Sequence, residues 1–74
     1  MLNYPDQNSG AGVSLLRLAA VKERTGCGRT LIYDLVNKGD FPAPRHIAGT
    51  RVSVWPSNEV DAWISRQLSG AAHG

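Results

Sequence analysis

The pattern of apolar and polar positions divides this chain into two loose ends and one region of short, closely spaced elements. Residues 1–13 are rich in Asn, Pro, Asp, Gln, Ser and Gly and show almost no apolar periodicity, which is typical of a disordered arm. Residues 69–74, SGAAHG, have a similar character, so we expect a flexible tail there. Residues 14–68 contain no repeat, low-complexity tract or linker, and we expect one folded domain over this range.

The first element predicted in this domain is a short helix. Leu18, Val21 and the aliphatic stem of Lys22 have the spacing of one helical face. Gly26 can adopt the left-handed conformation that ends a helix. The pattern therefore predicts a helix from about Ala19 to Thr25.

A second helical pattern starts only two or three residues later, at Gly28 or Arg29, and ends before Gly39. Its apolar face comprises Ile32, Leu35 and Val36. Two short helices joined by so tight a turn must cross steeply, which is the arrangement of a helix-turn-helix. In that motif the second helix lies in the DNA major groove and the first helix braces it.

The outward face of the second helix is polar and aromatic. With Ile32 at the centre of the buried face, a rotation of about 100° per residue turns four side chains outward and leaves two on the flanks. The outward residues are Thr30, Tyr33, Asp34 and Asn37, and the flanking residues are Arg29 and Leu31. An ordinary solvated helix has the same pattern, so this face alone does not distinguish solvent from DNA.

The segment after this helix favours the interpretation that the outward face contacts DNA. Pro42 and Pro44 prevent a helix, and two β-prone runs follow, Arg45–Ala48 and Arg51–Trp55. This pattern predicts a two-stranded hairpin. The cationic or titratable side chains near its tip are Arg45, His46 and Arg51, with no acid among them. We therefore expect a basic wing beside the second helix.

A last helix is predicted from the start signal at Pro56, Ser57 and Glu59. Its apolar stripe comprises Val60, Trp63, Ile64 and Leu68. We expect this stripe to close the core and both Trp55 and Trp63 to lie in it. The predicted fold class is mainly α with a small β-hairpin, a winged helix-turn-helix of three helices plus a two-stranded wing.

Several residue pairs between Leu15 and Ile64 carry a family resemblance. Among them are Thr25-Gly26, Ile32-Tyr33, Phe41-Pro42, Arg51-Val52 and Ala62-Trp63. At these positions the chain resembles the AlpA-like phage regulators and the related excisionases, whose helix-turn-helix is of the MerR type. The resemblance implies a winged fold, binding of double-stranded DNA, and a role in transcriptional control or in directing site-specific recombination.

The resemblance also implies a set of DNA-contacting side chains. From the second helix they are Arg29, Thr30, Tyr33 and Asn37. Asp34 is added because it faces outward on the same helix, although the family commonly has Arg or Lys at this position. From the residue ahead of the first helix and from the wing they are Arg17, Arg45, His46 and Arg51. Arg29 and Tyr33 would contact phosphates or base edges, and Thr30 and Asn37 would read the groove. Arg51 and Arg45 would contact the DNA backbone or the minor groove from the wing, and Arg17 and His46 would contact phosphates. Asp34 would either repel phosphates or accept a hydrogen bond from a cytosine amino group. A solvated surface position is the alternative for each of them.

Composition changes this picture little. The chain has eight Lys and Arg against six Asp and Glu, a net charge of +2, which permits a polyanionic partner without requiring one. There is no run of about 18 apolar residues and no signal-peptide pattern, so we expect a cytoplasmic, nucleoid-associated protein with no membrane partner. Cys27, His46 and His73 fall short of a tetrahedral zinc set, so we expect neither a metal nor a cofactor.

We expect no enzyme, because a chain of 74 residues cannot house a deep catalytic cleft and neither histidine is placed to act as an oriented base. Three functions remain: a transcriptional regulator, an excision factor that acts with a site-specific integrase, and a protein-binding adaptor. The cations around the second helix and the wing argue against the adaptor, and nothing separates the first two. No long dimerisation helix follows Leu68, so we expect a monomer that assembles with neighbouring copies on DNA.

Overall fold

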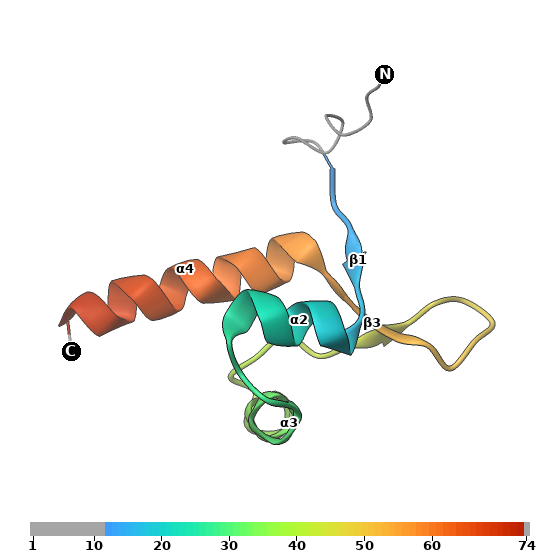
Figure 1. The fold of residues 1–74 in the computed structure, drawn as a ribbon, viewed down its shortest axis with the longest axis horizontal. Coiled ribbons are helices and arrows are strands. Elements are labelled where there is room, and N and C mark those ends of the chain that lie inside the picture. The colour runs from blue at the N-terminus through green and yellow to red at the C-terminus, as the bar shows by residue number, and fades with distance from the viewer. Residues whose placement is uncertain (1–11, 74) are drawn as a thin grey trace.

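The computed structural model describes residues 12–73, with side chains described as far as Gly70. In chain order the elements are β1 (Leu15–Leu16), α2 (Leu18–Thr25), α3 (Arg29–Lys38), β2 (Arg45–His46), β3 (Ser53–Pro56) and α4 (Ser57–His73). Helix α2 contacts both α3 and α4, and the hairpin and the C-terminal end of α4 point to opposite ends of the molecule (Figure 1). The predicted fold class, a mainly α winged helix-turn-helix, is confirmed.

The turn between α2 and α3 is held by local hydrogen bonds. Gly26 has a φ of 74°, and its N–H donates to the Lys22 carbonyl at 2.8 Å. The Thr25 hydroxyl donates to the Val21 carbonyl at 2.8 Å and accepts the N–H of Cys27 at 3.1 Å. A side chain at the Gly26 position would be strained at this φ. The two predicted helices are confirmed, with the first starting one residue earlier than expected.

The sheet has a third strand that the sequence did not predict. Its order is β1-β3-β2, and both pairings are antiparallel. Ser57 donates its N–H to the Ser14 carbonyl at 2.7 Å, and the Ser57 hydroxyl accepts the N–H of Ser14 at 2.8 Å. A strand of two residues is too short to show an alternating pattern, so β1 becomes recognisable only through its pairing with β3.

The hairpin forms as predicted, but its strands are shorter than the runs 45–48 and 51–55. The residues between them form a turn, in which the N–H of Thr50 donates to the Ile47 carbonyl at 2.9 Å. The Thr50 hydroxyl donates to the same carbonyl and accepts the N–H of Val52 at 3.1 Å. Gly49 adopts a φ of 78°, as this turn requires. The wing is therefore closed by its own hydrogen bonds.

Both tryptophans lie in the core, as expected. Trp55 is fully buried, and its indole N–H donates to the Pro42 carbonyl at 2.9 Å. The indole N–H of Trp63 donates to the Asp40 carbonyl at 2.7 Å. These two bonds fix the segment that connects α3 to the wing. The other members of the buried cluster are Leu16, Val21, Ile32, Phe41 and Val60, and Val54 of β3 is buried as well.

The last helix begins within its predicted start signal and extends beyond its predicted end. Pro56 ends β3, and the helix begins at Ser57. Leu68, assigned to the core stripe, is 69% exposed, and that assignment is wrong because the core ends about one turn earlier, near Ile64. The helix continues to His73 through most of the expected tail, whereas residues 1–11 of the expected arm lie outside the described residues. No helix in the described range is long and apolar enough to cross a membrane.

Candidate nucleic-acid interface

Helix α3 is fixed on the body of the protein by one aliphatic and one aromatic contact. Ile32 is fully buried. The ring of Tyr33 lies edge-on to that of Trp55, with the ring centroids 6.0 Å apart. Tyr33, which the helical phase placed on the outward face, is half-buried and packs against the core as well. The rotation of α3 about its axis is therefore set by the core.

The outward face of α3 forms a shallow hollow of about 470 Å³, lined by Arg29, Thr30, Tyr33, Asp34 and Asn37. These are the five α3 residues that we selected from the sequence, and their common surface matches the predicted helical phase. The guanidinium of Arg29 lies over the Tyr33 ring, 5.5 Å from its centroid, an arrangement that attracts the cation to the ring face. This contact holds Arg29 along the flank of the helix.

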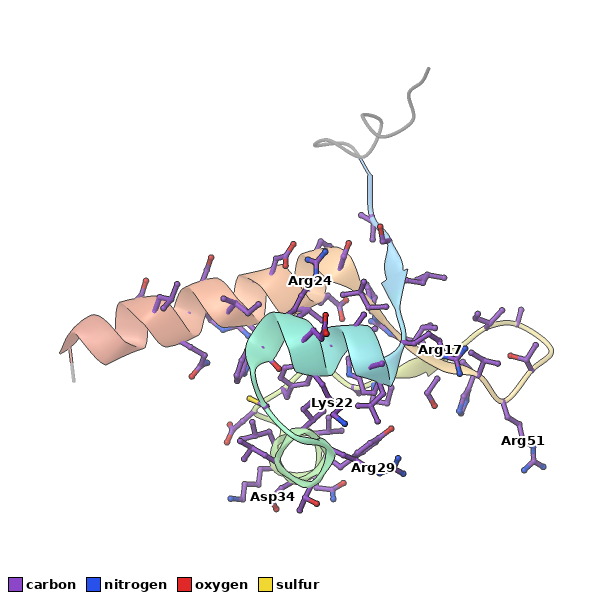
Figure 2. The ribbon with its side chains drawn as sticks, in the orientation of Figure 1. Arg17, Lys22, Arg24, Arg29, Asp34 and Arg51 are labelled. Atoms are coloured by element: carbon purple, nitrogen blue, oxygen red, sulfur yellow. The ribbon has the colours of Figure 1, made fainter. Side chains whose placement is uncertain are left out.

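A second hollow, of about 650 Å³, lies between the start of α2, helix α3 and the wing. It brings together Arg17, Arg29 and Arg51, which come from three separate parts of the sequence. Arg29 and Arg51 point to the side of the molecule on which α3 lies (Figure 2). None of the three cations forms an ion pair with an acid of residues 12–70. We call this surface the arginine groove.

Three other cations, which do not line the arginine groove, are paired with acids. The pairs are Arg24 with Asp61 at 2.7 Å, Lys38 with Asp34 at 3.2 Å, and Arg45 with Glu59 at 2.9 Å. Exposed pairs of this kind contribute at most about 1 kcal/mol to stability. No acid lines the arginine groove itself, and the nearest acid on α3, Asp34, lines the neighbouring hollow and is paired with Lys38.

The structure does not bring Arg45 and His46 into the arginine groove. Arg45 is directed to Glu59 on α4 and braces the wing against that helix. His46 is exposed on β2, where it pairs with Ser53 in the sheet register, and it does not line the groove. Of the wing residues selected from the sequence, Arg51 alone lines the groove.

Lys22 is a candidate that the sequence analysis missed, because its stem was assigned to the apolar face of the first helix. Its side chain is exposed and lies between α2 and α3 (Figure 2). Together with Gly28 it lines a hollow at the start of α3. The sequence could have indicated an exposed Lys22, since its position lies about 100° around the helix from the buried Val21. Lys22 therefore adds a cation near the start of α3, in a hollow that the acid Glu23 also lines.

The described part of the chain contains no cluster of three His, Cys, Asp or Glu side chains that could hold a metal ion. Cys27 is a free thiol, half-buried between α2 and α3. The chemistry that these surfaces offer is therefore hydrogen bonding and positive charge: guanidinium groups for phosphates, and hydroxyl and amide groups for base edges.

Comparison with known proteins gives one family. Residues 14–68 match the family model of the prophage CP4-57 regulatory protein (AlpA). The DNA-binding transcriptional activator AlpA of Escherichia coli K12 is 35% identical over 66 residues, which cover 81% of this chain and 93% of that protein. An uncharacterized protein of enterobacteria phage P4, ORF88, is 36% identical over 59 residues; these cover 80% of this chain and 66% of the phage protein. No solved structure matches significantly.

Proposed function

Because this chain belongs to the AlpA family of prophage regulatory proteins, we propose that it is a double-stranded-DNA-binding transcriptional regulator of a phage or another mobile element. The observation that supports this proposal most is the arginine groove, which lies directly beside the outward face of α3. In this proposal α3 enters the major groove, α2 braces it, and the wing lies over the neighbouring backbone.

The side chains divide into two kinds of contact. Arg17, Arg29 and Arg51 contact phosphates, which fixes the position of the protein on the duplex. Thr30 and Asn37 are exposed at the centre of the outward face of α3 and read base edges through their hydroxyl and amide groups. Arg45 and His46 contact the DNA backbone only if the wing moves closer to the DNA, because neither side chain lines the arginine groove. The proposal requires no cofactor and no catalytic step.

The role of the wing is tested by Arg51→Ala. Loss of a charge-assisted phosphate contact should weaken binding by about 1–2 kcal/mol on every duplex, whatever its sequence. The melting temperature should stay the same, because Arg51 is exposed and forms no ion pair with an acid of residues 12–70. The matched control is Arg66→Ala, which removes one charge from α4, away from the groove. Unchanged affinity for Arg51→Ala would mean that the hairpin has a structural role alone.

The role of Asp34 is tested by Asp34→Asn. In the structure this carboxylate is exposed and paired with Lys38, so its charge is partly compensated. If it repels phosphates, the variant should bind all duplexes more tightly. If it accepts a hydrogen bond from a cytosine amino group, the variant should bind the cognate site alone more weakly. Equal affinities for wild type and variant on both kinds of duplex would show that Asp34 does not face the DNA.

The proposal extends to assembly on DNA. One recognition helix and one wing bury only about 600–1,000 Å² of protein surface, which is little for high specificity. The wing and the end of α4 lie at opposite ends of the molecule (Figure 1), so a repeated contact from copy to copy need not close on itself. We therefore propose that neighbouring copies bind head to tail on repeated sites.

Such an assembly would also suit an excision factor that bends DNA for a site-specific integrase. Footprinting on the promoter next to the gene and on the nearest integrase attachment site separates the two roles. Protection at the attachment site, with stepwise complexes of altered gel mobility, would favour excision. A symmetric dimer on one palindromic promoter site would support the role of transcriptional regulator and argue against that of excision factor. The remaining alternative is a protein-binding adaptor, which requires that no duplex is bound even at low salt.

A further inference from the structure

Leu31 of α3 is a large apolar side chain that lies outside the core. It is 47% exposed, whereas Leu35 and Val36 of the same helix pack against the buried cluster. Single exposed leucines are common on protein surfaces, so exposure alone assigns no role. The position of this leucine on α3 is what gives it one.

Leu31 lies in the first turn of α3, at the edge of the face that the proposed function directs into the major groove. It is the i,i+3 neighbour of Asp34, which lines the hollow on the outward face. At about 100° per residue it falls on the opposite flank from Tyr33, about 160° away around the helix. The outward face therefore has two unlike edges. Arg29 and Tyr33 form the edge beside the wing. On the other edge Leu31 is the apolar side chain of the first turn, and the ion pair of Asp34 with Lys38 follows it along the helix.

An apolar side chain has a single match among the base edges of the major groove. Every base pair presents hydrogen-bond donors and acceptors there, and only thymine adds an apolar group, its 5-methyl. A leucine placed over a cytosine amino group or a guanine carbonyl would bury that group without a partner, at a cost. Placed over a thymine, it buries a methyl group.

We propose that Leu31 is a specificity-determining residue that selects thymine by contact between its side chain and the thymine 5-methyl group. The inference rests on the proposed function, because it requires α3 to lie in the major groove. It predicts that the preferred site contains a thymine on the side of α3 away from the wing.

The test uses a short duplex that the wild-type protein selects from a randomised library. Each thymine in turn is replaced by deoxyuridine, which removes the 5-methyl group and leaves every hydrogen-bonding group in place. At one position the wild-type protein should bind about fourfold more weakly, the change expected for one methyl group returned to water. Leu31→Ala should bind the thymine and uracil duplexes equally at that position. Leu68→Ala, which shortens an exposed leucine on α4, should keep the full wild-type difference.

Thermal melting checks that a change in binding by Leu31→Ala does not come from a loss of folded protein. Leu31→Ala should melt like the wild type, because the site is exposed and alanine is the stronger helix former. The inference is overturned if no thymine-to-uracil change weakens wild-type binding, or if Leu31→Ala keeps the difference. Failure of the wild type to bind any duplex would instead overturn the proposed function, and the role of Leu31 with it.

Discussion

Trp55→Ala should leave the protein barely stable at room temperature. Trp55 is fully buried, its indole N–H donates to the Pro42 carbonyl, and its ring supports Tyr33. Truncating a buried tryptophan to alanine costs about 3–5 kcal/mol. A domain this small has a free energy of unfolding near the low end of about 5–15 kcal/mol. The substitution therefore removes most of the available stability.

Circular dichroism during thermal unfolding measures this effect. Each kcal/mol corresponds to about 4–8 °C in a domain of this size, so the midpoint should fall by more than about 12 °C. Trp55→Phe should lie between alanine and wild type, because it keeps an aromatic ring and loses the bond to Pro42. Leu68→Ala should melt like the wild type, since Leu68 is largely exposed. A wild-type melting curve for Trp55→Ala would contradict the core described above.

The second large effect is expected for the double variant Arg17→Ala, Arg29→Ala. Both side chains line the arginine groove, and each should contribute about 1–2 kcal/mol to binding through a charge-assisted phosphate contact. Together they should weaken binding to every duplex by about 30- to 700-fold. The slope of log K against log salt should also become shallower by about two.

The matched control is the double variant Arg24→Ala, Arg66→Ala, which removes the same number of positive charges from surfaces outside the arginine groove. Arg24 is paired with Asp61 on α4, and Arg66 lies on α4 itself. This control changes the net charge equally, so it should reproduce only the small loss that comes from long-range attraction. Equal losses in the two double variants would show that net charge, and not the arginine groove, drives binding.

Local signals in the sequence predicted the first two helices well, whereas features that depend on contacts between distant residues were missed. Gly26 and Gly39 both adopt the left-handed conformation expected at helix ends, which is why the bounds of α2 and α3 came out within one residue. Strand β1 depends on pairing with β3 about 40 residues later, and no local pattern reveals it. Leu68 continued an apolar stripe, but the place where the core ends depends on the packing of all the elements.

The candidate site shows the same division. The outward face of α3 follows from helical phase alone, so its five lining residues could be selected from the sequence. The arginine groove combines the start of α2, helix α3 and the wing. Whether the arginines of these three elements come together depends on how the elements cross in the folded protein. The sequence selected both Arg45 and Arg51 from the wing, with Arg51 favoured. The tertiary structure shows that Glu59 on α4 binds the guanidinium of Arg45 and that Arg51 lines the groove.

The most direct measurement for the proposed DNA interface is the affinity of the wild-type protein for duplex DNA at several salt concentrations. The arginine groove and Lys22 offer four cations beside α3, so binding should neutralise about four phosphates. The plot of log K against log salt should then be linear with a slope of about −4. An affinity that does not change with salt, or the absence of binding at low salt, would contradict the proposal that this surface binds DNA.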